Sequence, residues 1–505
     1  MNTRTDAAVI GGRRVHFIGI GGCGTSGLAR MMRSRGAFVT GSDGEASDVT
    51  RSLAADGIEV TVGPPAASVP DGTDLVVFSA AVQESNPQLA AARSAGIECI
   101  NYAQALGAAQ ADRTAVSIAG THGKSTTTAL LSHVLIEAGL DPSVIVGAHC
   151  PQFGGGTRTG SERIPMGALA GEPGIFVAEA CEFNRSFHAH RPTLALINNV
   201  EEDHLDCYAS LDEIVKSFRA FAGLLPAADR GGKLLIAHEG AHRRAVASGL
   251  SCSVHTFGWS PSADFRVEFI PATNEGALYQ QDACVVSWRG HLIGEHNALN
   301  AAAAAILASW LGASWRDIQR GLESFAGIDR RMQKIGECES PTGARFSVFD
   351  DYGHHPTECE RTLAALRSAH DPRRLICVFQ PHQHSRTRFL LEQFAQSFGR
   401  ADLVIVPPIY FVRDSEIERT RVCSEDLVER LRARGTEAMA IDDFGAITDR
   451  IAADARDGDL VVVMGAGPVW KVAHELVRQH GAASQGAASR AAATCPPRAA
   501  ASPTE

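Results

Sequence analysis

The chain has 505 residues, of which 45% are hydrophobic and 21% are charged, and its formal net charge is −10 at pH 7. This composition is ordinary for a globular protein of about three domains, and the acidic balance argues against a nucleic-acid-binding protein. No apolar run approaches the roughly 18 residues that span a bilayer, and the start lacks the apolar core of a signal peptide. We therefore expect a cytoplasmic protein without membrane insertion; the sequence does not indicate an oligomeric state.

The cysteines do not predict a metal site or a disulfide framework. There are 12 of them, scattered from Cys23 to Cys495, and none forms a C-x-x-C pair. We expect free thiols that behave as small buried hydrophobic side chains.

The first 112 residues read as a unit of alternating strands and helices, which predicts a parallel sheet. Its first strand leads into the glycine-rich turn 19–27, and Asp43 follows about 20 positions later. Such a turn suits NAD, a UDP-sugar, or only a tight helix–strand contact. The predicted elements are strands over 15–18, 38–40, 74–79 and 97–100, and helices over 28–35 and from 86 onward.

A second glycine turn opens the predicted central domain, which covers residues 113–330. It follows the apolar run 115–118 and precedes a helix-like run over 129–140. Its residues are Gly120, Thr121, His122, Gly123, Lys124, Ser125 and Thr126. Backbone N–H groups of such a turn point at phosphates, the lysine adds positive charge, and the serine hydroxyl suits Mg²⁺. The usual spacing needs glycine where this chain has Ile118, so we predict a variant P-loop; the alternative is a structural turn with an exposed lysine.

Two further clusters follow buried strands of this domain. Glu179 ends the strand 175–178, and His204 lies in the polar segment after the strand 194–197. Carboxyl ends of parallel strands gather on one edge, so both side chains are expected to face the P-loop and to suit a Mg²⁺ ion. The alternatives are a solvated carboxylate and an ion-paired surface histidine. Before the first of these strands, residues 150–174 are predicted to be a long, mobile surface loop.

The remaining chain predicts the rest of the central domain and a third α/β domain. An alanine-rich helix begins near His296 and Asn297. The third domain is predicted over 331–480, with strands over 346–349, 375–379, 403–406 and 460–464 and polar residues at strand ends. Residues 481–505 lack periodicity and are predicted to be a disordered tail.

Taken together, these stretches resemble the Mur ligase family. The most specific are Asp351-Tyr352-Gly353-His354-His355-Pro356-Thr357-Glu358 and Phe379-Gln380-Pro381-His382, joined by Glu179-Ala180, His296-Asn297 and Arg330-Arg331. The resemblance covers roughly residues 14–478 and implies three α/β domains: a Rossmann-like UDP-binding domain, a P-loop domain with a mostly parallel sheet, and a Rossmann-like C-terminal domain.

The resemblance also implies substrates and roles. It implies an ATP-dependent ligase that joins L-alanine to the carboxylate of UDP-N-acetylmuramate through an acyl phosphate, with ATP and Mg²⁺ bound. The implied UDP-sugar residues are Gly21, Gly22, Gly24, Ser42, Asp43 and Ser79. The implied ATP residues are those of the P-loop with Asn297, Arg331 and Asp351, and the implied metal residues are Ser125, Glu179 and His204. The implied catalytic residues are Lys124, His204, His355 and Arg386, with His204 and His355 both open as the base.

This chain departs from the family's pattern at several positions on the substrate side. They are Pro64, Cys181, Phe183, Arg413 and Pro468. One alternative is a related ligase for another amino acid, for a preformed peptide or for folate, although the UDP-type domain before the P-loop disfavours the folate enzymes. The others are an oxidoreductase that uses the turn 19–27 and a nucleotide-gated binding protein without catalysis.

Overall fold

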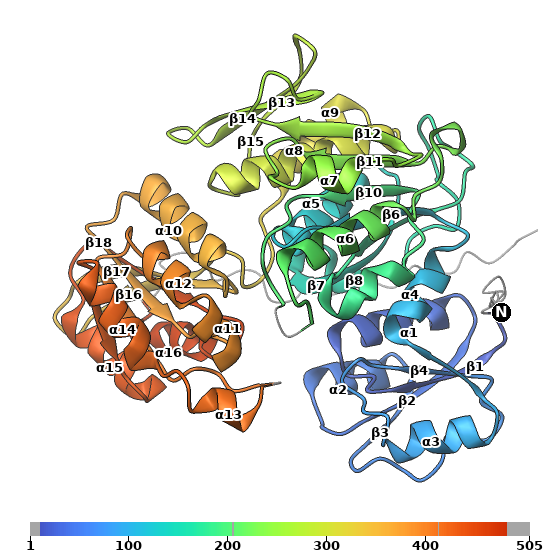
Figure 1. The fold of residues 1–505 in the computed structure, drawn as a ribbon, viewed down its shortest axis with the longest axis horizontal. Helices are drawn as coiled ribbons and strands as arrows, with labels where there is room; N and C mark the ends of the chain where they lie inside the picture. Colours follow the sequence, from blue (N-terminus) through green and yellow to red (C-terminus); the bar gives the residue numbers. More distant parts are fainter. Residues whose placement is uncertain (1–10, 205–206, 413, 482–505) are drawn as a thin grey trace, which may run out of the picture.

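Three separate sheets organise the chain, each covered by helices (Figure 1). The computed structural model describes residues 11–204, 207–412 and 414–481, so Arg413 and the predicted tail from 482 onward lie outside the described residues. Within these ranges no helix is long and apolar enough to cross a membrane. The predicted three-domain α/β architecture is confirmed.

The first sheet has five parallel strands in the order β3-β2-β1-β4-β5. Successive connections leave β1 toward opposite edges of the sheet, so a crevice opens at the carboxyl ends of β1 and β4. The elements are β1 (Arg14–Ile18), α1 (Cys23–Ser34), β2 (Phe38–Asp43), α2 (Asp48–Ala55), β3 (Glu59–Val62), β4 (Leu75–Phe78), α3 (Pro87–Ser94), β5 (Glu98–Asn101) and α4 (Tyr102–Gln110).

The helix predicted over 28–35 begins earlier, at Cys23. The Thr25 hydroxyl donates to the carbonyl oxygens of Gly19 at 2.9 Å and Gly22 at 3.0 Å. The glycine-rich segment therefore forms the first turn of α1, and helical N–H groups come directly after β1.

The central sheet has ten strands in the order β15-β14-β13-β12-β11-β10-β6-β9-β7-β8. The strands from β13 to β7 in this order run parallel, whereas β14, β15 and β8 pair antiparallel to their neighbours. The strands are β6 (Thr114–Ala119), β7 (Ser143–Cys150), β8 (Gly155–Arg158), β9 (Ile175–Glu179), β10 (Leu194–Ile197), β11 (Lys233–Ala237), β12 (Ser253–Gly258), β13 (Phe265–Ile270), β14 (Glu275–Gln280) and β15 (Ala283–Arg289).

Helices α5 and α8 pack against each other in the core of this domain. The small side chains of residues 301–305 on α8 are almost fully buried and allow a close approach to α5. The helices are α5 (Lys124–Glu137), η1 (Pro151–Phe153), η2 (Phe183–Ala189), α6 (Leu211–Ala222), η3 (Ala228–Arg230), α7 (Arg243–Ala247), α8 (Glu295–Trp310) and α9 (Trp315–Ser324). The sequence prediction placed the start of α5 too late, at 129.

The prediction of a long loop over 150–174 is wrong for its first part. Residues 155–158 form β8, which pairs antiparallel with β7. A Cβ atom added to Gly27 of α1 would lie 1.8 Å from Thr157 Cγ2. Because β8 is a short strand at the edge of the sheet, its local sequence carries no alternating pattern. The hairpin provides a surface on which the first domain packs.

The third sheet has six strands in the order β16-β17-β21-β18-β19-β20, parallel except for β16. The carboxyl ends of β17, β21 and β18 therefore share one edge. The elements are β16 (Gln333–Glu339), β17 (Arg345–Asp351), α10 (Pro356–His370), β18 (Arg374–Phe379), α11 (His384–Phe389), α12 (Leu391–Ser397), β19 (Leu403–Val406), α13 (Glu416–Arg419), α14 (Ser424–Ala433), β20 (Glu437–Ala440), α15 (Phe444–Asp454), β21 (Asp459–Met464) and α16 (Trp470–His480).

Candidate active site

The residues predicted to bind a UDP-sugar gather at the carboxyl ends of β1, β2 and β4. The Gly21 N–H donates to Asp43 Oδ2 at 2.7 Å, so the carboxylate holds the glycine turn. The Ser42 hydroxyl is buried and donates to Gln88 Oε1 at 2.6 Å. Ser79 begins the loop after β4 and its N–H donates to the Ile18 carbonyl at 3.0 Å. Gly22 and Gly24 flank the start of α1, and a Cβ at Gly24 would lie 2.5 Å from the Tyr102 hydroxyl.

The P-loop joins β6 to α5, as the sequence predicts, and its glycines are required by the backbone. Gly120 and Gly123 have φ angles of 135° and 82°, a region that favours glycine. A Cβ at Gly123 would also lie 2.6 Å from Asn300 Oδ1 and 2.8 Å from Asn198 Nδ2. Two asparagines from other elements thus press against the turn, and no larger residue fits at this position.

The segment after β10 supports the P-loop from one side. The Thr121 N–H donates to the Asn199 carbonyl at 3.1 Å, and the His122 N–H donates to Asn199 Oδ1 at 2.7 Å. In return, the Glu201 N–H donates to the Thr121 hydroxyl at 2.9 Å. The loop conformation is therefore fixed by neighbouring backbone before any nucleotide binds.

The Lys124 side chain folds back onto the backbone of the P-loop. Its Nζ donates to the carbonyl oxygens of Gly120 at 2.6 Å and Thr121 at 3.0 Å, and it forms an ion pair with Glu182 at 2.9 Å. Burial lowers the pKa of Lys124, but the Glu182 carboxylate outweighs it, and the net shift is upward. Lys124 is held in its charged form, as a phosphate ligand requires.

Ser125, Glu179 and His204 lie near the ion pair of Lys124 and Glu182. Glu179 accepts from the Gly147 N–H at 2.7 Å and from the Ser125 side chain. His204 has a left-handed backbone (φ 54°), and its Nε2 lies 3.8 Å from Glu182 and 3.7 Å from Asp203. Burial raises the pKa of Glu179, although both hydrogen bonds and Lys124 counteract it. A positive ion would relieve this cost, so hydroxyl and carboxylate oxygens fit Mg²⁺ here.

A cavity of about 330 Å³ lies between the central and C-terminal domains. It brings together P-loop residues, the start of α8 and the third domain, three segments in which the sequence analysis expects ATP contacts. Phe257, Trp259 and Leu292 form an apolar part of its wall. The predicted ATP residues that line it are His122, Gly123, Thr126, Asn297, Arg331 and Asp351. An apolar wall beside convergent polar groups suits a nucleotide.

The third-domain residues of this cavity are fixed by hydrogen bonds. Asp351 ends β17 and accepts from the Met332 N–H at 2.7 Å and the Gly353 N–H at 2.6 Å. Burial raises the pKa of Asp351 to about 6, although Arg331 and both N–H groups counteract it. Arg331 lies over the Tyr352 ring, 5.1 Å from its centroid, and 3.6 Å from Glu358. Both groups face the cavity that the P-loop lines.

Arg386 and Asp203 form a buried ion pair between domains. Arg386 Nη2 donates to Asp203 Oδ1 at 2.7 Å, and both side chains are 8% exposed. Burial alone raises the pKa of Asp203, but Arg386 and the nearby histidines outweigh it, so the carboxyl stays ionised. The sequence predicted Arg386 near the substrate but gave no partner for it.

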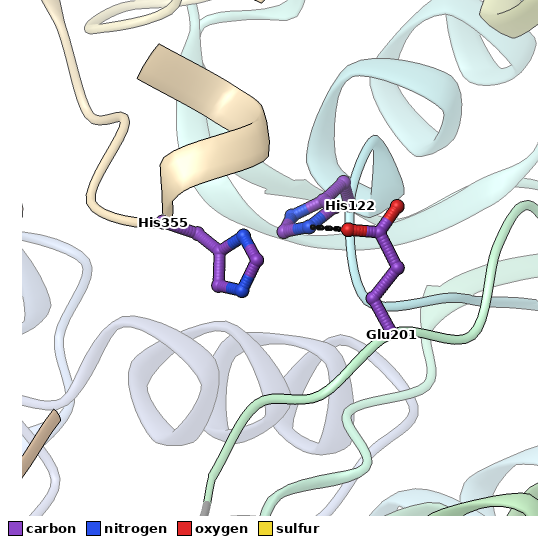
Figure 2. A group of neighbouring side chains, drawn as sticks. All are labelled: His122, Glu201 and His355. Carbon is purple, nitrogen blue, oxygen red and sulfur yellow. Dashed lines mark ion pairs between the residues drawn. The ribbon is translucent and has the colours of Figure 1, made fainter. Parts of the chain in front are cut away.

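Figure 2 shows a further cluster of side chains, formed by His122, Glu201 and His355. Their ligand atoms lie within 4.8 Å of one another, close enough for a metal ion. However, His355 Nε2 already contacts the Glu202 carbonyl at 3.1 Å, and its Nδ1 accepts from the Thr357 N–H at 3.3 Å. With no free nitrogen on His355, the group suits ion pairing and not metal binding.

Several residues of the site were not among those predicted from the sequence. Glu182, Asp203 and Glu201 pair with side chains far along the chain, and Asn300 contacts the P-loop. Glu182 and Glu201 each lie within four residues of a motif position that was singled out. Polar residues directly after buried strands were the available signal for them.

The chain matches three family models in order. "Mur ligase family, catalytic domain" covers residues 14–114, "Mur ligase middle domain" covers 118–308, and "Mur ligase, glutamate ligase domain" covers 330–467.

Curated relatives match over nearly the whole chain. A UDP-N-acetylmuramate–L-alanine ligase of Agathobacter rectalis is 36% identical over 92% of this chain and 98% of its own length. One of Streptomyces avermitilis is 38% identical over 92% of this chain and 97% of its own length.

Solved structures share the fold. The UDP-N-acetylmuramate-alanine ligase of Thermotoga maritima aligns with a TM-score of 0.72 at 24% identity, over 92% of this chain and 98% of its own. A murein peptide ligase of Psychrobacter arcticus aligns with a TM-score of 0.67 at 25% identity, over 92% and 98% of the two chains.

Proposed function

Because the chain belongs to the Mur ligase family, we propose that it joins L-alanine to the carboxylate of UDP-N-acetylmuramate at the expense of ATP, in the cytoplasm, as a step of peptidoglycan precursor synthesis. The observation that carries the proposal is the cavity of about 330 Å³ where the P-loop faces Arg331 and Asp351 of another domain. An enzyme that transfers phosphate between bound substrates needs such a shared, closable cavity.

The first step is phosphorylation of the muramoyl carboxylate. A carboxylate oxygen attacks the γ-phosphorus of ATP, the bond to the β-phosphate oxygen breaks, and ADP leaves. Lys124 carries the charge that the phosphoryl group needs, since its ammonium is buried and held positive. Arg331 supplies a second positive charge from the C-terminal side.

We propose Ser125 and Glu179 as the residues that hold Mg²⁺ beside the phosphates, with His204 close to them. The ion, when bound, neutralises phosphate charge and polarises the transferring group. Support for the site comes from the hydrogen bond between Ser125 and Glu179 and from the burial of the carboxylate.

The second step is attack by the amino group of L-alanine. The amine nitrogen bonds to the acyl carbon, the tetrahedral intermediate collapses, and phosphate leaves. A base must take the amine proton. We assign this to His204, because both ring nitrogens of His355 are engaged, whereas His204 Nε2 faces the carboxylates of Glu182 and Asp203, which can hold the imidazolium that forms.

The test is phosphate release with ATP, Mg²⁺, UDP-N-acetylmuramate and an amino acid, leaving out one component at a time. We expect release only with all four, and release at the same rate from ATP alone contradicts the ligase proposal. NADH is added to the same assay and its absorbance is followed. A constant absorbance excludes the oxidoreductase alternative.

The acceptor is tested with a panel of L-alanine, L-serine, glycine, D-alanine and a preformed peptide, with the product mass measured. L-Alanine should give the highest kcat/KM. A higher value for the peptide instead favours a peptide ligase, a class to which the Psychrobacter arcticus structure belongs by its name.

A further inference from the structure

The His122 side chain lies in the nucleotide loop, yet its contacts are with carboxylates. Its Nδ1 lies 3.1 Å from Glu358 Oε1, and its Nε2 lies 3.4 Å from Glu201 Oε2. The side chain is 9% exposed, and its backbone N–H already donates to Asn199. Both ring nitrogens therefore face carboxylates, Nδ1 in a hydrogen bond with Glu358 and Nε2 in an ion-pair contact with Glu201 that has no hydrogen-bond geometry.

The two carboxylates belong to different domains. Glu201 follows β10 of the central domain, whereas Glu358 lies in the first turn of α10 in the C-terminal domain. Further contacts join the same segments: the Thr357 hydroxyl donates to Glu201 at 2.6 Å, and the His355 ring lies 4.7 Å from the His122 ring (Figure 2). His122 is the P-loop member of this interdomain contact.

The charges around His122 favour its protonated form. Burial lowers the pKa of His122, but Glu201 and Glu358 outweigh it and raise the pKa to about 9. The charge of His122 also acts on His355 and His296, while Arg331 and His354 lie beside Glu358 and Arg361 acts on Glu201. The pairing is complete below the ordinary value of 6.5 and is lost as the pH rises through about 9.

Glu358 connects the contact with His122 to the nucleotide cavity. It lies 3.6 Å from Arg331 and accepts from the His354 N–H at 2.9 Å. Arg331 and Glu358 both line the nucleotide cavity. A protonated His122 therefore sets the place of α10 and of Arg331 relative to the P-loop.

We propose that His122 is a positioning residue that couples the P-loop to the C-terminal domain through Glu358, and that its side chain is not a ligand of the nucleotide. This rests on the proposed function, because coupling of the two domains matters for turnover only if phosphate transfer takes place between them. The coupling keeps the cavity assembled around ATP while the acyl phosphate forms.

The test is a double-mutant cycle of His122→Asn and Glu358→Gln, followed by kcat, by KM for ATP and by fluorescence titration with mant-ATP. Each single variant should lower kcat about tenfold, and the double variant should be no slower than the slower single one. The affinity of the His122→Asn variant for mant-ATP should change less than about threefold. Independent, multiplying effects, or a loss of mant-ATP affinity as large as the loss in kcat, overturn the proposal.

Small-angle scattering gives a readout that needs no turnover and separates this inference from the proposed function. The wild-type chain should become larger between pH 7 and pH 10, whereas His122→Asn should be large at both values. Unchanged dimensions in both proteins overturn the proposal even if ligation is confirmed. If His122→Asn does not fold by circular dichroism, His122→Gln takes its place in both measurements.

The matched control is His149→Asn. His149 pairs with Asp329 at 2.8 Å and also joins the central domain to the segment that leads to the third domain, but its side chain is 55% exposed. An exposed pair contributes little, so kcat and dimensions should stay as in the wild type. An effect equal to that of His122→Asn shows general weakening of the domain contact and contradicts a specific role of His122.

Discussion

The two glycine turns of this chain share one construction and differ in what surrounds them. Each follows the carboxyl end of a parallel strand and opens a helix, β1 to α1 and β6 to α5. The first turn carries no charged residue of its own; it is held by the Asp43 carboxylate and the Thr25 hydroxyl, and the Tyr102 side chain lies against Gly24. The second contains Lys124 and His122, whose partners come from β9, β10 and the C-terminal domain. The same local structure thus serves binding in one domain and charge stabilisation in the other.

The largest effect is expected for Lys124→Ala. Loss of the buried ammonium should lower turnover by about a thousandfold or more, because the transferring phosphoryl group loses its positive partner. Binding of UDP-N-acetylmuramate, measured by calorimetry, should stay nearly unchanged, because its crevice lies in another domain. Lys216→Ala is the control, since Lys216 is 75% exposed and pairs with Asp212 at 2.6 Å. Loss of both turnover and UDP-N-acetylmuramate binding contradicts the view that the two turns act separately.

The next-largest effect concerns the buried ion pair of Arg386 and Asp203, which belongs to the surroundings of the second turn. Asp203→Asn leaves Arg386 buried without its carboxylate and should lower the free energy of unfolding by about 3 kcal/mol, measured by urea denaturation. The exposed pair of Arg51 and Asp48, near the first turn, serves for comparison. Asp48→Asn should cost less than about 1 kcal/mol. Equal losses for the two variants contradict the distinction.

The glycines themselves provide a direct comparison of the turns. Gly123→Ala places a Cβ at φ 82° and 2.6 Å from Asn300 Oδ1, so ATP affinity should fall about tenfold or more. Gly21→Ala has no such φ angle, and its Cβ meets side-chain atoms, Asp43 Oδ2 at 2.8 Å and Thr50 Cγ2 at 3.2 Å. UDP-sugar affinity should therefore fall a few fold. Binding titrations of both ligands to both variants decide whether the effects stay within their own domains.

The smallest effect is a pH dependence of KM for ATP that KM for UDP-N-acetylmuramate does not share. Burial raises the pKa of Asp351 to about 6, so below this value the carboxyl becomes protonated and its hydrogen bonds to the Met332 and Gly353 N–H groups weaken. KM for ATP should rise a few fold as the pH falls through about 6, while KM for UDP-N-acetylmuramate stays constant there. A parallel change in both constants contradicts the assignment to Asp351.

Much of the fold was predictable because it depends on local patterns. Apolar runs such as 194–197 and 460–464 are strands as expected, and the alanine-rich run after Asn297 is part of helix α8. The hairpin of β7 and β8 and the antiparallel strands β13 to β15 were missed. β8 and β15 lie at the two edges of the sheet, and β13 to β15 mix buried with exposed residues, so they lack the continuous hydrophobic run of a buried parallel strand.

The candidate site was predictable to a similar extent and for the same reason. The positions of Asn297, Arg331 and Asp351 followed from motifs, and these residues line one cavity with part of the P-loop, whereas Lys124 pairs with Glu182 and does not line that cavity. Their partners Glu182 and Glu358 did not follow, because no local pattern states which carboxylate a buried cation meets.

The sequence by itself determined three α/β domains, two glycine turns and the polar residues at strand ends, since strand and helix periods and glycine's backbone freedom are properties of neighbouring residues. Only the tertiary structure decided that Lys124 meets Glu182, that Arg386 meets Asp203 and that His122 lies between Glu201 and Glu358. These pairs join residues 58 to 236 positions apart. Their energies depend on burial and on domain packing, which no local stretch of sequence contains.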